Sequence, residues 1–224
     1  MEMISLQFFG GRGSDGGGGG ESLSSSSGKS VNVIDTLDVW SYRHNPSNQP
    51  YVDSINSAVK DMNDDFPGLM NFVQEVDTAT LGGRDKIETL GFYGNGRVAL
   101  NSNYTNVDKM NTVYDKAVES GFHPSRGDKN GTQAVAYHEM GHALSDYIGS
   151  KNGMDIDQAS KAIVERAYKA TKGKGGTKAW AGKISGYAQE NYAECVAEAV
   201  CDYYCNGNKA SSASKAIVKE MKNF

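Results

Sequence analysis

A tract of low complexity near the start of the chain limits how much of it can fold. Between Gly10 and Ser30 the sequence has nine glycines and seven serines among 21 residues. Such a segment buries too little apolar area to offset the entropy that ordering would cost. We therefore expect residues 1–30 to form a disordered Gly/Ser-rich arm and residues 31–224 to form one folded domain.

The charge and the hydropathy of the chain argue against two classes of partner. The 224 residues include 23 Lys and Arg against 27 Asp and Glu, a formal net charge of −4. A general nucleic-acid binder needs a basic surface instead. No segment has the roughly 18 consecutive apolar residues of a membrane span. We expect no nucleic-acid partner and no membrane partner.

The compartment is inferred from the first residues and from the cysteines. The opening MEMISLQFFG lacks the basic start and the uninterrupted apolar core of a signal peptide. Cys195, Cys201 and Cys205 crowd into one expected helix, where the geometry for pairing is poor. We expect reduced thiols and a cytoplasmic protein without a signal peptide.

The secondary structure expected after the arm is mostly helical. Apolar periodicity and stop signals predict helices over residues 52–64, 108–120, 132–148, 156–170, 191–205 and 211–222. Asp108 is the expected cap of the second helix, and Gly149 is expected to end the third. Residues 171–176 are expected to form a loop rich in lysine and glycine.

The sheet is expected to be small. Residues 90–101 resemble a hairpin, because two β-prone runs flank a Gly-Asn-Gly sequence whose residues accept the positive φ of a tight turn. Residues 72–76 can form either a strand or a helix end. The predicted fold class is therefore α+β, mostly helical with a small sheet.

Two histidines four residues apart lie in the helix expected over residues 132–148. They belong to the run His138-Glu139-Met140-Gly141-His142. Side chains at this spacing leave a helix on the same face, so both imidazoles can bind one metal ion. Glu139, about 100° around the helix from His138, can still reach a water on that ion. We interpret the run as a metal site, with two solvated histidines as the alternative.

A catalytic zinc needs a third protein ligand and an open fourth position. The other histidines are His44 and His123, and a structural or substrate-side role fits His123 equally well. Glu190, Glu194 and Glu198 are spaced four apart in an otherwise apolar expected helix. Buried carboxylates need partners, which a metal and its histidines would supply. A solvated acidic stripe is the alternative, and spacing alone does not rank the three.

The two motifs together are specific enough to suggest a family. The first is His138-Glu139-x-x-His142, and the second is Ser185-x-Tyr187-x-x-x-Asn191-x-x-Glu194-x-x-Ala197-Glu198-Ala199. This pair resembles the gluzincin metallopeptidases of the anthrax lethal factor catalytic-domain type and their phage and prophage relatives. The resemblance covers residues 90–204, about half of the chain. The two segments that precede the first motif, residues 97–101 and 121–124, resemble the family less specifically than the two motifs do. Cys195 and Val196 depart from the aromatic residues usual in the family.

The resemblance implies a zincin-like metallopeptidase domain and a role for each matching residue. The implied Zn²⁺ ligands are His138, His142 and Glu194. Glu139 would be the base that acts on a metal-activated water. Tyr187 would face the reacting carbonyl as a hydrogen-bond donor, and Glu198 would orient an imidazole of a ligand.

The function that the resemblance implies is hydrolysis of peptide bonds in a protein or peptide substrate. The enzyme would be a zinc endopeptidase encoded by a phage or prophage and made in the cytoplasm of a bacterial host. One alternative is a virion or head-associated structural protein that retains the fold and docks to a virion protein through residues 1–30. Another is a toxin or effector protease. The base Glu139 and the three implied ligands His138, His142 and Glu194 are all intact, which argues against a decayed scaffold, because drift tends to remove the base or a ligand first.

Overall fold

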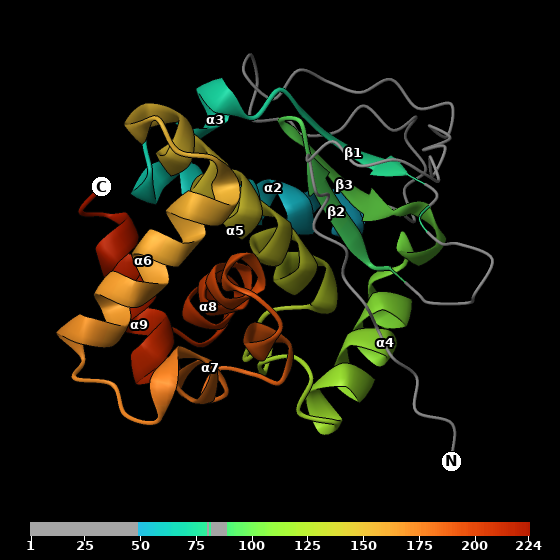
Figure 1. Cartoon of the computed structure of the whole chain (residues 1–224). Coiled ribbons are helices and arrows are strands. Elements are labelled where there is room, and N and C mark those ends of the chain that lie inside the picture. Colours follow the sequence, from blue (N-terminus) through green and yellow to red (C-terminus); the bar gives the residue numbers. More distant parts are fainter. Residues whose placement is uncertain (1–48, 80, 82–88) are drawn as a thin grey trace, which may run out of the picture.

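The computed structural model describes residues 49–79, 81 and 89–224, which form a mostly helical structure with one three-stranded sheet (Figure 1). This confirms the α+β class. The expected arm over residues 1–30, the first residues of the expected domain and His44 lie outside the described part of the chain. The helices are α2 (Gln49–Asp65), α3 (Leu69–Phe72), α4 (Val107–Glu119), α5 (Gly131–Asn152), α6 (Ile156–Ala170), α7 (Gly176–Ala181), α8 (Tyr192–Asn206) and α9 (Ser212–Met221).

All six helices expected from periodicity are present, and two short ones were missed. With four residues in α3 and six in α7, neither is long enough to show a helical repeat of apolar residues. The described residues also form three short 3-10 turns, η2 (Ser102–Tyr104), η3 (Tyr187–Gln189) and η4 (Gly207–Lys209). None of the described helices combines the length and the apolar composition that crossing a bilayer would require.

Two helix ends differ from the expected ones. Asn106, and not Asp108, caps α4, because its side chain accepts a hydrogen bond from a backbone N–H of the first turn at 3.0 Å. Helix α5 continues past Gly149 and ends at Gly153, whose φ of 66° is left-handed. Gly149 is needed inside the helix, since a Cβ there would lie 2.8 Å from the carbonyl oxygen of Met154.

The sheet has the strand order β1–β3–β2. Strand β1 (Glu75–Ala79) pairs in parallel with β3 (Arg97–Asn101), and β2 (Gly91–Gly94) pairs with β3 in antiparallel fashion. Asn95 and Gly96 connect β2 to β3 with φ angles of 52° and 74°, as a tight hairpin turn requires. The hairpin prediction is confirmed, and residues 72–76 contain both a helix end and the start of a strand.

Helix α5 is buried along most of its length because it packs against elements on several sides. Helices α2, α4, α6 and α8 contact it, and so do strands β2 and β3 (Figure 1). Its most extensive packing is against α8. A Cβ on Gly141 would lie 2.9 Å from the Cα of Ala197 and 3.2 Å from the Cβ of Val200. Gly141 therefore permits the close approach of the two helices.

Gly141→Ala is expected to destabilise the protein although alanine favours helices. The added methyl group meets backbone and branched side-chain atoms of α8, and overpacking of this kind costs about 1–3 kcal/mol. Denaturant unfolding monitored by circular dichroism measures the change in the free energy of unfolding. Ser150→Ala, on the exposed end of the same helix, is the control and should stay within about 0.5 kcal/mol of the parent. A Gly141→Ala protein more stable than the parent would contradict the close packing.

Candidate metal centre

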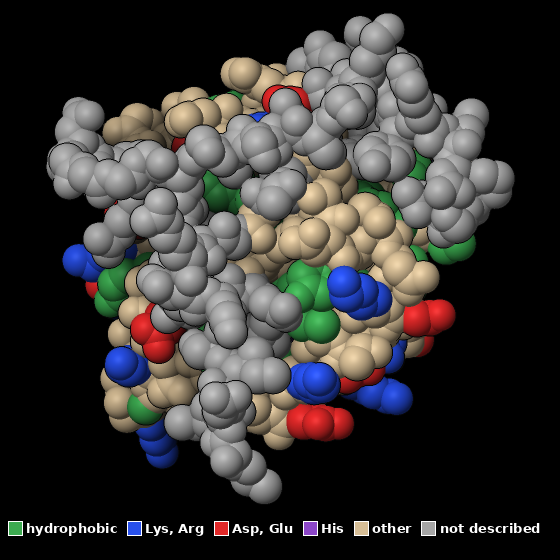
Figure 2. Space-filling view, turned by 90° about the vertical axis from the view of Figure 1, so that its right-hand side faces the viewer, with side chains coloured by type: hydrophobic (Ala, Val, Ile, Leu, Met, Phe, Trp, Pro, Cys, Tyr) green, Lys and Arg blue, Asp and Glu red, His purple; other side chains and the backbone are tan. Residues whose placement is uncertain are grey.

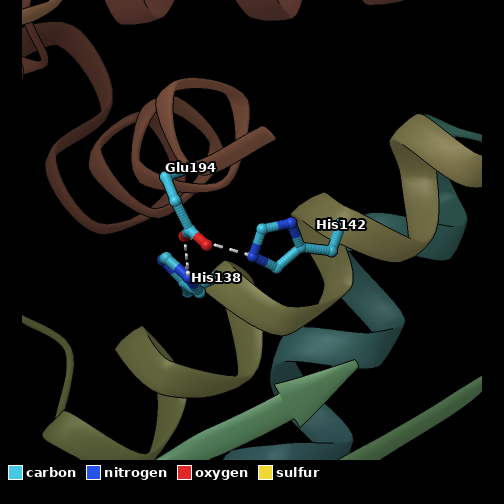
Figure 3. A group of neighbouring side chains, drawn as sticks. All are labelled: His138, His142 and Glu194. Carbon is cyan, nitrogen blue, oxygen red and sulfur yellow. Dashed lines mark ion pairs between the residues drawn. The ribbon is translucent and has the colours of Figure 1, made fainter. Parts of the chain in front are cut away.

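Helices α5 and α8 bring three side chains together. His138 and His142 leave the same face of α5, and Glu194 points at both of them from the first turn of α8 (Figure 3). Asn191 determines where α8 begins, because its side chain accepts a hydrogen bond from the backbone N–H of Glu194 at 2.9 Å. The N-terminal cap of α8 thus places Glu194 opposite the two imidazoles.

The distances between these side chains suit a shared metal ion. Oε2 of Glu194 lies 3.2 Å from Nε2 of His138 and 3.3 Å from Nε2 of His142. One ligand atom from each residue lies within 4.8 Å of the other two. Tetrahedral bonds of about 2.0–2.2 Å hold neighbouring ligand atoms roughly 3.3–3.6 Å apart. The buried group of His138, His142 and Glu194 can therefore hold a metal ion.

The electrostatics of this group also favour a cation. Burial alone would lower the pKa of His138, but hydrogen bonds from its ring to Glu194 and Glu198 raise it to about 10. Burial would raise the pKa of Glu194, yet the charge of His142 and the hydrogen bond to His138 hold it well below its usual range. The centre thus stabilises positive charge beside Glu194, and a metal cation can supply that charge in place of protons.

Glu139 lies beside the group and does not belong to it. Its side chain is buried, and neither carboxylate oxygen makes a hydrogen bond within the described part of the chain. Burial, the largest effect, raises its pKa to about 7. Strand β2 packs directly against the side chain of Glu139 at Gly91, where an added Cβ would lie 2.7 Å from the Cγ of Glu139. Sequence reasoning gave no sign of this contact between residues 48 positions apart.

Tyr187 reaches the same centre from the turn η3. Its ring stacks on that of His138, with centroids 6.0 Å apart and an interplanar angle of 19°. Its backbone N–H donates to the carbonyl oxygen of Phe122 at 3.0 Å, which ties the turn to the loop after α4. Burial first, and then the charge of Glu194, raises the pKa of Tyr187 far above its usual range. Its hydroxyl therefore keeps its proton and remains a donor.

Glu198 lies one turn after Glu194 and contacts His138 at Nδ1, the ring nitrogen that does not face Glu194. Its Oε1 accepts a hydrogen bond from Nδ1 of His138 at 2.8 Å and another from Nδ1 of His123 at 3.0 Å. Its Oε2 accepts from Oγ of Ser185 at 2.6 Å. Burial opposes its charge, but the two imidazoles outweigh burial and lower its pKa to about 2.

Glu190, the first of the three glutamates spaced four residues apart, does not belong to the metal centre. Glu190 is exposed and precedes α8, which begins after Asn191. The expectation of a single helical stripe through Glu190, Glu194 and Glu198 is therefore wrong for Glu190. Cys195, Cys201 and Cys205 are free and buried, as expected for thiols.

The described side chains that are visible on the face drawn in Figure 2 carry charges of both signs. Lys and Arg side chains are interspersed there with Asp and Glu, and no histidine is visible among its described residues, as expected for the buried His138 and His142.

Comparison with known protein families, with curated proteins and with solved structures finds no match to this chain. The buried His–His–Glu group between α5 and α8, with Glu139 beside it, is the feature that points most directly to a chemical function.

Proposed function

We propose that the protein is a zinc-dependent peptidase of the gluzincin type. The observation that carries the proposal is the position of Glu194 Oε2, 3.2 Å and 3.3 Å from the Nε2 atoms of His138 and His142. Two imidazoles and one carboxylate are the ligands of a known class of catalytic zinc sites, which leave a fourth position open. The buried carboxylate of Glu139 can act as a base, since neither of its oxygens accepts a hydrogen bond from another described residue.

Each residue of the centre has a task in peptide hydrolysis. His138, His142 and Glu194 would hold the zinc ion, which when bound would supply Lewis acidity for an attacking water and for the substrate carbonyl. Glu139 accepts the proton of the attacking water and returns it to the leaving amine. Tyr187, which keeps its proton, donates a hydrogen bond to the oxygen on which negative charge develops.

The origin of the chain from a phage or prophage is part of the proposal and rests on the sequence resemblance alone. A virion structural protein that merely retained this fold would have no use for a proton acceptor buried beside a metal group. Glu139, buried and without a hydrogen bond to any described residue, therefore favours the peptidase over the structural alternative.

Cleavage of a mixed peptide library by the zinc-loaded protein tests the proposal and reports the sequence preference together. The same protein carrying Glu139→Gln serves as the matched control, because the substitution changes one carboxylate oxygen into an amide. New fragments are expected with the parent and not with the variant. Equal fragments from both proteins, or none from a zinc-loaded parent, would contradict the proposed activity.

The purified protein is expected to retain about one zinc ion per chain, since the described residues contain one group with suitable geometry. Elemental analysis after zinc loading and desalting measures the stoichiometry. His142→Ala removes one of the three ligands and should lower the zinc content markedly. A parent protein that retains no zinc, or a His142→Ala protein that retains as much as the parent, would show that this group is not the binding site.

A further inference from the structure

His123 is a buried histidine that lies close to the candidate metal centre without belonging to it. It sits in the loop after α4, and 3% of its surface is exposed. Its ring stacks on that of Tyr114, with centroids 5.5 Å apart and an interplanar angle of 11°. The ring centroid of His138 lies 6.3 Å away. The proposed mechanism assigns no task to this residue.

The hydrogen bonds of Glu198 determine which nitrogen of each ring carries a proton. Nδ1 of His123 and Nδ1 of His138 lie 3.0 Å and 2.8 Å from the same oxygen, Oε1 of Glu198. An ionised carboxylate only accepts hydrogen bonds, so both Nδ1 atoms must donate. A neutral His138 that donates through Nδ1 has a free electron pair on Nε2, the atom that faces Glu194. This is the tautomer that binds a metal.

The orientation of Glu198 depends on all three of its donors. Ser185 holds Oε2 at 2.6 Å, while the two histidines hold Oε1. A buried carboxylate that loses one of its donors is held less firmly and becomes able to rotate. Rotation would weaken the acceptor that keeps the proton of His138 on Nδ1.

The loop that carries His123 is itself held on two sides. The hydroxyl of Tyr114 donates to the carbonyl oxygen of Pro124 at 3.1 Å. On the other side, the backbone N–H groups of Gly186 and Tyr187 donate to the carbonyl oxygens of residues 121 and 122 at 2.8 Å and 3.0 Å. The loop therefore has a defined position relative to the turn that carries Ser185 and Tyr187.

We infer that His123 is a positioning residue of the metal centre, which fixes Glu198 by donating to Oε1 and thereby holds His138 in its metal-binding tautomer. The inference rests on the proposed zinc centre and does not depend on peptidase activity. It predicts that the donor at Nδ1, and not the aromatic ring, is what zinc binding requires of residue 123.

Two substitutions separate the donor from the ring. His123→Asn places an amide N–H on the same γ carbon that carries Nδ1, but it removes the stacking on Tyr114. His123→Phe keeps an aromatic ring and removes the donor. Competition with a chromophoric chelator measures zinc affinity in the full chain. His123→Phe is expected to weaken zinc binding by about 10–100-fold, as loss of an outer hydrogen-bond partner typically does, and His123→Asn should bind nearly as tightly as the parent.

A double-mutant cycle tests whether His123 acts through Glu198. In a Glu198→Ala background, His123→Phe should cause little further loss of zinc affinity, because the acceptor that His123 positions is gone. Losses that add fully in the double variant would overturn the proposed route. Circular dichroism of each variant without zinc shows whether it folds, and His123→Ala replaces His123→Phe if the larger ring prevents folding.

The outcomes distinguish this inference from the proposed function. A parent protein that does not bind zinc would overturn both. A parent that binds zinc, together with a folded His123→Phe protein that binds it equally tightly, would overturn the role of His123 and leave the metal centre intact. A His123→Asn protein that folds but binds zinc as weakly as His123→Phe would show that the ring, rather than the donor, is required.

Discussion

Glu139→Gln is expected to retain zinc and to lose peptidase activity by about 10²–10⁴-fold, the usual contribution of a positioned general acid–base. The amide has nearly the same shape as the carboxylate but does not accept the proton of the attacking water. Glu139 also lies outside the His138–His142–Glu194 group, so its replacement leaves all three ligands in place. The ratio kcat/KM on a peptide selected from the library, measured together with zinc content, gives both results.

Glu190→Gln is the matched control for this substitution. It makes the same chemical change at an exposed glutamate outside the group, and it should keep the activity of the parent. A Glu139→Gln protein with full activity would show that the mechanism does not use Glu139 as a base. A variant that loses its zinc would instead place Glu139 among the ligands.

Alanine substitutions of the three glutamates are expected to weaken zinc binding in the order Glu194, then Glu198, then Glu190. Glu194→Ala removes one of three ligands and should show the largest loss. Glu198→Ala removes the acceptor of His138 Nδ1 and should cost about 10–100-fold. Glu190→Ala removes an exposed carboxylate and should have the smallest effect. Competition with a chelator ranks all three on one scale.

The unfolding of each variant without zinc completes this comparison. Loss of Glu198 also leaves the buried His123 and Ser185 without the acceptor that they share, so this variant should be the least stable of the three. If Glu190→Ala released zinc while Glu194→Ala retained it, the assignment along α8 would be wrong by one turn. The role of Tyr187, which follows from the same assignment, would then be lost as well.

Features that depend on neighbours in the sequence could be predicted without the structure. His138 and His142 share a face because a helix brings residues four apart into line, and a helix was expected over residues 132–148. The turn at Asn95 and Gly96 is equally local, since few residues adopt a positive φ at low cost. The pairing of these histidines with a glutamate from the later helix was expected from family resemblance, and spacing alone left three candidates.

Residue spacing left three candidate glutamates, and the tertiary structure decided which of them faces the histidines and what surrounds them. Asn191 caps α8 and so excludes Glu190 from the helix, whereas Glu194 enters its first turn. The hydrogen bond between His123 and Glu198 joins residues 75 positions apart, and nothing in the sequence around either residue marks the other. Such contacts have no local signature, because they depend on how closely whole helices pack, and at α5 and α8 that distance is permitted by the missing side chain of Gly141.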